Sequence, residues 1–322
     1  MIMQHNPRRF ALSLVACAAS LIWAAGTAAA LAVTSDSGIS FSGDALYWRP
    51  SGLNARITAP TPLSAVPSPG QAEGIHFGFA PGYRLQADWQ DWRVSWLDLQ
   101  TKDDFSAACP TGLCFSAPLV GVPISGAAAS SDVRLQVADL EFRQPLADYS
   151  ESSKRTFTWA LGARFARLTN DTATSYQDFG AVPGPVFNTQ SRAVNNLWGA
   201  HSEVEGKYAI SSAFTASGKI GFSLMDGRSD FHMAGVESGG GIGTQYVEYR
   251  TAADDIVPIW ELGARLTYSP LKDLELSAGY DFMEFSEVFL KPILPTGTLL
   301  DEGLSQTVSF QGPRAGFSWR FE

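Results

Sequence analysis

The feature that most limits the fold is a regular alternation of apolar and polar side chains over long segments. In FTWALGARF, which begins at Phe157, aromatic and aliphatic residues occupy every second position, and Thr158, Gly162 and Arg164 lie between them. The segments FTASGKIGFSL, from Phe214, and LELSAGYDF, from Leu274, alternate in the same way. Because successive side chains of a β-strand point to opposite faces, each segment predicts a strand with one apolar and one polar face.

The predicted strands are also long. They run about 10–16 residues, whereas strands of soluble domains usually run about 5–6, and a tilted strand needs about 9–11 to cross a bilayer core. The predicted strands are 40–57, 74–88, 91–102, 133–146, 155–169, 196–210, 213–227, 256–269, 273–288 and 305–321. This length favours strands that cross a membrane.

The connections between these strands are alternately short and long. The short ones lie near Trp89, at 148–154, at 211–212 and at 270–272. The long ones are 58–73, 103–132, 170–195, 228–255 and 289–304, with Pro-rich and Gly-rich stretches typical of loops. The alternation predicts an all-β fold, a ten-stranded antiparallel transmembrane β-barrel with short periplasmic turns and long extracellular loops.

The last segment, RAGFSWRFE, has apolar Phe317, Trp319 and Phe321 on one face. An open sheet edge is unstable in hydrocarbon, so the last strand of a barrel must pair with the first. The segment resembles the C-terminal signal by which bacterial barrels engage the outer-membrane assembly machinery. The residues that match the signal are Arg314, Gly316, Trp319 and Phe321, and Glu322 departs from it. An ordinary amphipathic edge strand is the alternative.

The N-terminus has the features of an export signal. Arg8 and Arg9 precede an apolar stretch, and small residues then predict cleavage after Ala30 or Ala32. We therefore expect residues 1–32 to be a cleaved signal peptide and residues 33–322 to be the barrel domain. An uncleaved membrane anchor and lipoprotein processing at Cys17 are the alternatives.

Charge and cysteines narrow the functional classes further. The net charge of −9 argues against a nucleic-acid partner, which would need a basic surface. In an exported protein, Cys109 and Cys114, separated by the turn-forming PTGL, suggest a disulfide. Two thiols alone give half a metal site, so no metal is predicted, and no motif calls for a cofactor.

Several segments together resemble the Legionella major outer membrane protein family of pore-forming barrels. They include GDALYWRPSGLNARIT, GFAPGYRLQADWQDWRVSWLDLQTK, VADLEFRQPL and PIWELGARLTYSPLKDLELSAGYDF. The resemblance implies a multi-pass barrel in the cell outer membrane of a Gram-negative bacterium, surrounded by lipid and permeable to small solutes or ions. Porins of this family often assemble as multimers, so the resemblance leaves a homo-oligomer open.

If the apolar faces contact lipid, the charged residues of the other faces point into the barrel lumen. The predicted lumen charges are Arg84, Asp88, Asp139, Glu141, Arg143, Arg164, Glu203, Glu205, Lys207, Lys219, Glu261, Arg265, Glu275, Asp281 and Arg320. They would either set ion selectivity or form a salt-bridge lattice that fills a narrow barrel. Acids slightly outnumber bases among them, which predicts a weak preference for cations.

Other functional classes are weighed against a pore. Asp230 and His232 lie in a predicted outer loop, where some ten-stranded barrels carry protease residues, but one pair of residues forms no catalytic site, and no catalytic residue is predicted. An adhesin or structural surface barrel is the main alternative. A soluble barrel or sandwich would leave the apolar faces exposed to water. We therefore predict a pore-forming, porin-like protein without enzymatic activity.

Overall fold

The computed structural model describes residues 38–53, 56–60, 73–108, 114–116, 123–146, 154–178, 186–239, 242–289 and 305–321. Within these ranges the chain forms thirteen β-strands. No helix in this described part is long and apolar enough to cross a membrane. The predicted signal peptide, residues 1–32, lies outside the described residues.

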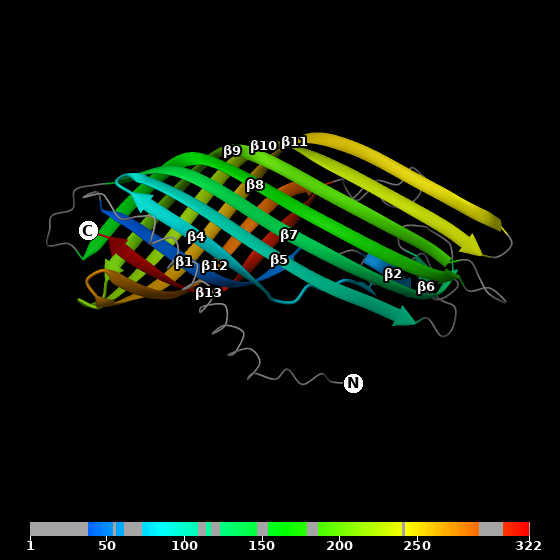
Figure 1. Ribbon diagram of the computed structural model, residues 1–322, viewed down its shortest axis with the longest axis horizontal. Coiled ribbons are helices and arrows are strands. Elements are labelled where there is room, and N and C mark those ends of the chain that lie inside the picture. Colours follow the sequence, from blue (N-terminus) through cyan, green and yellow to red (C-terminus); the bar gives the residue numbers. More distant parts are fainter. Residues whose placement is uncertain are drawn as a thin grey trace.

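Ten of the strands close into an antiparallel barrel (Figure 1). They are β1 (Ile39–Ser51), β4 (Ala80–Trp89), β5 (Trp92–Ala108), β7 (Pro123–Pro145), β8 (Arg155–Asp178), β9 (Val186–Ala209), β10 (Phe214–Gly239), β11 (Ile242–Leu271), β12 (Leu274–Phe289) and β13 (Ser305–Phe321). The last strand pairs with the first, from Phe321 opposite Ile39 to Ser309 opposite Ser51. The predicted ten-stranded antiparallel barrel is therefore confirmed.

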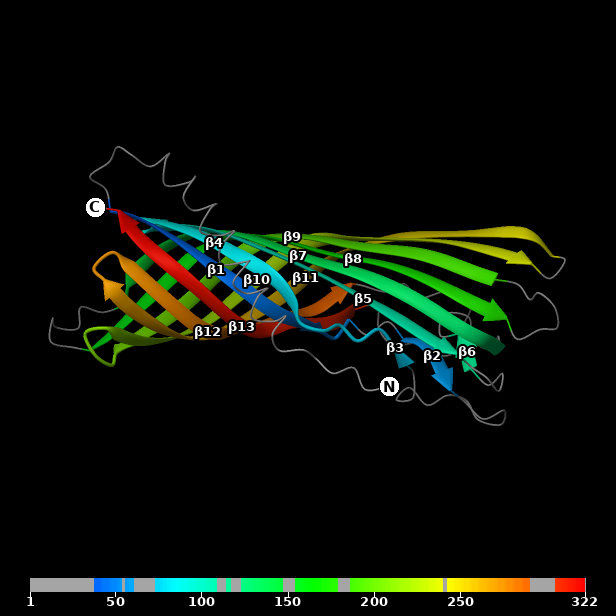
Figure 2. The ribbon, with the colours of Figure 1, turned by 60° about the horizontal axis from the view of Figure 1, so that its bottom comes forward.

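Three short strands extend the sheet at the outer end of the barrel, the end opposite the tight turns (Figure 2). They are β2 (Arg56–Pro60), β3 (Glu73–Gly74) and β6 (Cys114–Ser116). β6 pairs with β7, β2 pairs with β6, and β3 pairs with β2. Parts of the predicted loops 58–73 and 103–132 are therefore strands.

The strand boundaries correct the prediction most strongly at the outer end, where β7 to β11 project beyond the other strands (Figure 2). Much of the predicted loops 170–195 and 228–255 is strand, because β8 continues to Asp178 and β10 continues to Gly239. The first strand ends at Ser51 instead of residue 57, and the second begins at Ala80 instead of residue 74.

The sequence predicts loops for these outer segments because the apolar side chains move from the outward face of each strand to the inward face. On β10 the outward side chains are apolar at Ile220 and Leu224 and charged at Asp226, Arg228 and Asp230. The inward side chains change in the opposite sense, from Lys219 in the charged interior to fully buried Met225. A search for apolar outward faces therefore stops near the middle of the strand.

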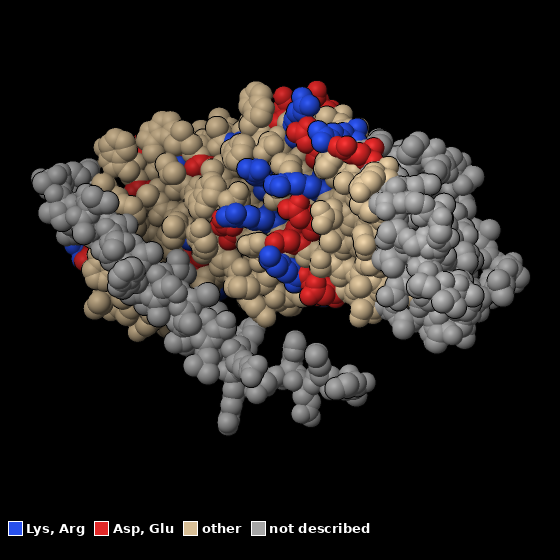
Figure 3. Space-filling model, turned by 45° about the vertical axis from the view of Figure 1, so that its right-hand side comes forward, with Lys and Arg blue, Asp and Glu red and all other residues tan. Residues whose placement is uncertain are grey.

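The change on the outer surface occurs at one level around this side of the barrel. Cross-strand pairing places Gln136, Arg167, Asn196 and Arg228 next to one another on β7 to β10. The row of outward residues below them includes Phe165 and Trp198, which are exposed by 42% and 64%, and Asp226, so on β10 the change begins one row lower. Figure 3 shows mixed blue and red side chains on the outer part of this face and a mostly tan surface beside them. The row marks the outer limit of an apolar band that suits hydrocarbon.

The interior divides into three levels along the barrel. Nearest the tight turns lie charged residues of the mouth layer, which are Asp88, Arg93, Arg143, Glu205, Lys207, Arg265, Glu275 and Arg320. Next lie those of the deep layer, which are Asp44, Arg84, Asp139, Glu141, Arg164, His201, Glu203, Lys219, Glu261, Asp281 and Arg314. Beyond these is an apolar layer, whose largest fully buried side chains include Trp48, Leu135, Met225, Ile259, Phe285 and Phe310.

The segments that follow β1 and precede β4 contribute to the apolar layer. Gly52 has a positive φ of 82°, and a Cβ there would lie 2.0 Å from the carbonyl oxygen of Thr307. Only glycine fits such a turn without strain. Beyond it Leu53 is 2% exposed, and it shares the apolar cluster with Ile75 and Phe77.

Candidate functional site

The candidate site is the charged interior of the barrel, which the strand alternation fills from every side. A strand whose outer face is apolar turns its polar residues inward, and the ten closed strands bring these residues together. In the membrane, charged groups are tolerated where water or opposite charges surround them. Many of the described ion pairs join neighbouring strands, and a few, such as Arg84 with Asp281 and Arg164 with Glu261, join non-adjacent strands and so tie the walls together across the interior.

Arg164 is the centre of the deep layer. Its Nε lies 2.6 Å from Asp139 Oδ1 and its Nη2 lies 3.0 Å from Asp139 Oδ2, which makes a bidentate pair. Its Nη1 also donates to Glu261, which lies three strands away on β11. The Arg164 side chain is only 2% exposed. Fork-shaped pairs of this kind are the strong form of charged hydrogen bond.

A second group of the deep layer joins β1, β4, β12 and β13. Arg84 Nη1 lies 3.1 Å from Asp281 Oδ2. Arg314 Nη1 lies 3.3 Å from the same Asp281 oxygen and 3.4 Å from Asp44 Oδ2. Lys219 continues the lattice on the other side, at 2.8 Å from Glu203 and 3.5 Å from Glu261.

His201 sits inside this lattice with Ser223 and Glu141. Its Nδ1 lies 2.9 Å from Ser223 Oγ, and its Nε2 lies 3.3 Å from Glu141 Oε1. The order serine, histidine, acid is that of a hydrolytic triad, but Ser223 is fully buried and Arg164 donates to its Oγ at 3.1 Å. Neither Ser223 nor His201 lines the cavity in the charged interior. The arrangement therefore works as part of the hydrogen-bonded lattice.

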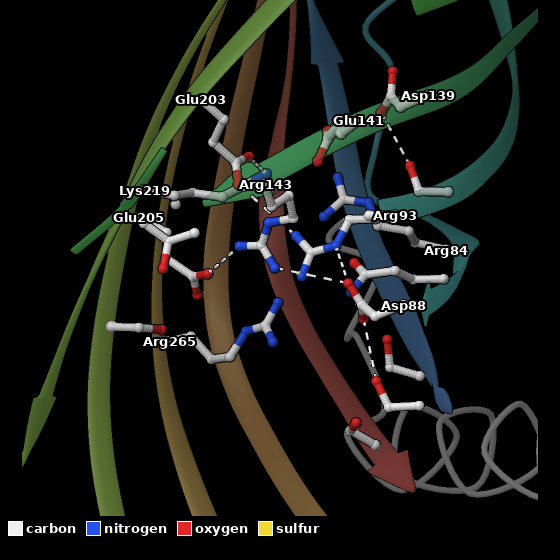
Figure 4. A pocket seen from close by; sticks show the side chains of 18 of the residues that line it. Arg84, Asp88, Arg93, Asp139, Glu141, Arg143, Glu203, Glu205, Lys219 and Arg265 are labelled. Carbon is white, nitrogen blue, oxygen red and sulfur yellow. Dashed lines mark hydrogen bonds and ion pairs between the residues drawn. The ribbon is translucent and has the colours of Figure 1, made fainter. Parts of the chain in front are cut away.

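The mouth layer surrounds a cavity of about 370 Å³ (Figure 4). Arg93 Nε lies 2.7 Å from Asp88 Oδ1, and Arg143 Nη2 lies 2.8 Å from Glu205 Oε2. Arg143 Nη1 is 3.7 Å from Asp88. The lining also includes Gln90 in a tight turn, so the cavity reaches the end of the barrel that carries the tight turns.

The predicted lumen charges meet to different degrees. The structure joins eleven of the fifteen in ion pairs within 4.0 Å, which are Arg84, Asp88, Asp139, Arg143, Arg164, Glu203, Glu205, Lys207, Lys219, Glu261 and Asp281. Glu141 contacts His201 at 3.3 Å. Lys207 belongs only loosely, at 3.8 Å from Glu205 with its side chain 49% exposed. Arg265, Glu275 and Arg320 line the cavity without a described ion pair.

Three charged groups of the interior were missed by the sequence reasoning. They are Asp44, Arg93 and Arg314. Arg93 alternates with the exposed Trp92 and Val94, so its phase alone would have placed it inside. Arg314 was assigned to the assembly signal only, yet its side chain is 3% exposed and ion-paired. A Cβ on Gly316 would lie 2.0 Å from Asp44 Oδ1, so this glycine makes room for the buried acid.

These additions correct the predicted charge balance. With Arg93, Arg314 and Asp44 included, the mouth and deep layers hold nine basic and nine acidic side chains. The lining of the cavity itself includes nine basic and seven acidic residues, because Asp44 and Asp281 lie behind it. The interior therefore gives no basis for the expected preference for cations.

Other predicted sites lie elsewhere. Asp230 and His232 are on the outer face of β10, where Asp230 pairs with Arg228 at 3.0 Å and His232 with Glu248 at 3.1 Å. Hydrogen bonds from His232 and Arg250, beyond the apolar band, lower the pKa of Glu248. The predicted disulfide involves Cys109, which lies outside the described residues. The described part of the chain holds no group of three or more metal-binding side chains.

Residues 34–321 match the family described as Legionella pneumophila major outer membrane protein precursor. The chain belongs to this family. The predicted resemblance and the location in the bacterial outer membrane are thereby confirmed. Lipid therefore covers the apolar band. Comparison with curated protein sequences finds no match.

Solved structures of other outer-membrane barrels are similar to this one. They include the outer membrane protease OmpT of Escherichia coli, at 10% identity and a TM-score of 0.49 over 88% of this chain and 97% of that chain. The toluene transporter TodX of Pseudomonas putida has 12% identity and a TM-score of 0.34 over 89% and 90%. OprG of Pseudomonas aeruginosa has 10% identity and a TM-score of 0.31 over 89% and 96%. Nothing about activity follows from likenesses at these scores.

Proposed function

We propose that this barrel is a narrow outer-membrane pore for small solutes or ions, closed on its outer side by the apolar layer. The observation that carries the proposal is the charged cavity of about 370 Å³ inside the barrel, which reaches the periplasmic turns. Charged groups in a barrel interior act on passing ions through their local field. A lattice with a purely structural role would not need a space of this size.

The apolar layer is the proposed gate. Phe285 and Phe310 pack edge to face with ring centroids 6.0 Å apart, and Trp48 is fully buried with them. The guanidinium of Arg84 lies 5.7 Å from the centre of the Trp48 ring, so the gate begins directly above the deep layer. Hydrophobic constrictions stop ions by excluding water, and small displacements of a few side chains can admit it.

The parts of the chain that could move the gate are those that connect β1 with β4. Leu53, Ile75 and Phe77 belong to the apolar cluster although they lie outside the barrel strands. Their withdrawal would remove apolar side chains from the outer end of the interior. In this arrangement the outer connections would control access to the pore.

The test is single-channel conductance of the refolded protein in planar bilayers. We expect a low-conductance wild type, and a larger or more frequently open channel in Trp48→Ala. The matched control is Phe222→Ala. Phe222 points outward to lipid, whereas Trp48 points into the barrel, so this variant should conduct like the wild type. Circular dichroism and the heat-dependent gel shift of barrels would show that each variant is folded. Silent membranes with all three proteins would contradict the proposal.

An adhesin or structural surface barrel is the second candidate, and the projecting sheet favours it. Strands β7 to β11 extend beyond the apolar band with charged outer faces such as those of Arg228 and Asp230. Such a surface suits contact with a polar partner. If the protein binds cells or surface glycans and does not conduct, this candidate replaces the pore.

The remaining partners are part of the proposal. Gly316, Trp319 and Phe321 would form the signal for the barrel assembly machinery, together with Arg314, whose side chain also joins the interior lattice. A disulfide between Cys109 and Cys114 would close a small outer loop. Removal of residues 1–32 would follow export. Chemical crosslinking in native membranes would decide whether the barrel is a homo-oligomer.

A further inference from the structure

The two charged layers differ in sign. The deep layer holds six acidic and four basic side chains, apart from His201. The mouth layer holds five basic and three acidic side chains. Its basic members are Arg93, Arg143, Lys207, Arg265 and Arg320. The positive excess therefore faces the cavity at its periplasmic end.

Two arginines of the mouth layer have unused hydrogen-bond donors. The Nε atoms of Arg143 and Arg265 are buried and donate to no partner among the described residues. Arg143 is held in place by Glu205 at 2.8 Å and Asp88 at 3.7 Å through its other nitrogens. Arg265 has no carboxylate partner within the described ranges. A buried donor without an acceptor is unfavourable, so the described residues leave both guanidinium groups incompletely satisfied.

The three guanidinium groups approach one space. Figure 4 shows Arg93, Arg143 and Arg265 extending toward one another from β5, β7 and β11. We propose that the mouth layer binds a small oxyanion, such as inorganic phosphate. The planar guanidinium group presents paired N–H donors that match the oxygens of phosphate or carboxylate. The cavity of about 370 Å³ has room for such an ion and its water.

The ligand is a free ion instead of a lipid headgroup, because these guanidinium groups lie inside the barrel and line its cavity. The inference deepens the proposed function, since small anions would be the solutes that the pore selects, and that part rests on the pore. Binding itself does not depend on conduction. The two can therefore be tested separately.

The experiment is calorimetric titration of the refolded full chain with inorganic phosphate, in detergent without phospholipid. Saturable binding is expected for the wild type. Arg265→Gln removes a donor without breaking a described ion pair, and it should weaken binding about tenfold or more. Arg265→Lys keeps the charge and should give an intermediate affinity, because lysine lacks the fork. Arg143→Gln should weaken binding similarly, provided that circular dichroism shows a folded barrel.

Arg167→Gln is the matched control, because Arg167 lies on the outer surface of β8, and its affinity should equal that of the wild type. Absence of saturable binding, or equal affinity in Arg265→Gln, would overturn the inference. In nanodiscs, added phosphatidylglycerol should not compete with phosphate, and competition would identify a headgroup site and overturn the free-ion assignment. Binding without conductance would refute only the pore, and conductance without phosphate binding would refute only the anion site.

Discussion

The half of the barrel near the tight turns, here called the lower half, and the outer half place polar and apolar side chains on opposite faces of the same strands. In the half near the tight turns, lipid covers an apolar outside and ion pairs fill the inside, as at Leu161 and Arg164 of β8. In the outer half of the same strand, Arg167 faces outward and Leu168 is fully buried inside. The outer half is thus built like a soluble domain, with an apolar core and a polar surface. The difference shows that the surrounding medium decides which face of a strand is polar.

The largest expected effect comes from breaking the ion lattice of the lower half. Arg164→Ala leaves Asp139 and Glu261 buried without their main partner, and such a change costs about 3–5 kcal/mol. Urea unfolding of the barrel in lipid vesicles measures it. Arg167→Ala, three positions along the same strand, should change the free energy of unfolding by no more than about 0.5 kcal/mol. Similar costs at both positions would contradict the assignment of the two faces.

Next in size is the apolar core of the outer half. Leu168→Ala should lower the free energy of unfolding by about 2–5 kcal/mol, since Leu168 is 0% exposed and leaves a cavity. Leu161 is 53% exposed to lipid on the same strand, so Leu161→Ala opens no cavity and should cost clearly less. The same unfolding measurement compares them. A larger loss from Leu161→Ala would mean that the outer half has no dry core.

The position of the lipid boundary can be measured on β10. Ile220→Arg introduces a charge on the lipid face within the apolar band and should cost about 2–4 kcal/mol if it lies near the bilayer centre. Asp226→Arg lies at the level of the boundary, where the cost falls to about 0–1 kcal/mol. Equal costs at the two positions would move the boundary outward along the strand.

The ten strands and their antiparallel closure could be predicted because lipid imposes a simple rule on the outward face. The rule fails where the strand leaves the lipid. Beyond Asp226 the alternation of β10 continues with the faces exchanged, and the many small and polar residues there resemble loops. Pairing with β9 and β11 over the full length makes them strands, and single-strand patterns do not report pairing.

The interior could be predicted as a set of charges but not as a network. Strand phase placed Arg164, Asp139 and Glu261 inside, yet their contact depends on which strands face each other across a closed barrel. Arg314 is a second residue whose contacts could not be predicted from the sequence. Its place in a C-terminal signal explained the residue fully in sequence terms, and only the closure against β1 brings it to Asp44.

The division of the interior into a wet and a dry part is tested most directly by thiol labelling on β10. In a background with Cys17, Cys109 and Cys114 changed to serine, Ser217→Cys lines the cavity, while Met225→Cys lies in the apolar layer. A charged methanethiosulfonate reagent should modify Ser217→Cys rapidly in the folded barrel and leave Met225→Cys largely unmodified. Equally fast modification of both would mean that water passes freely through the level of Trp48 and Phe310, and the proposed gate would not exist.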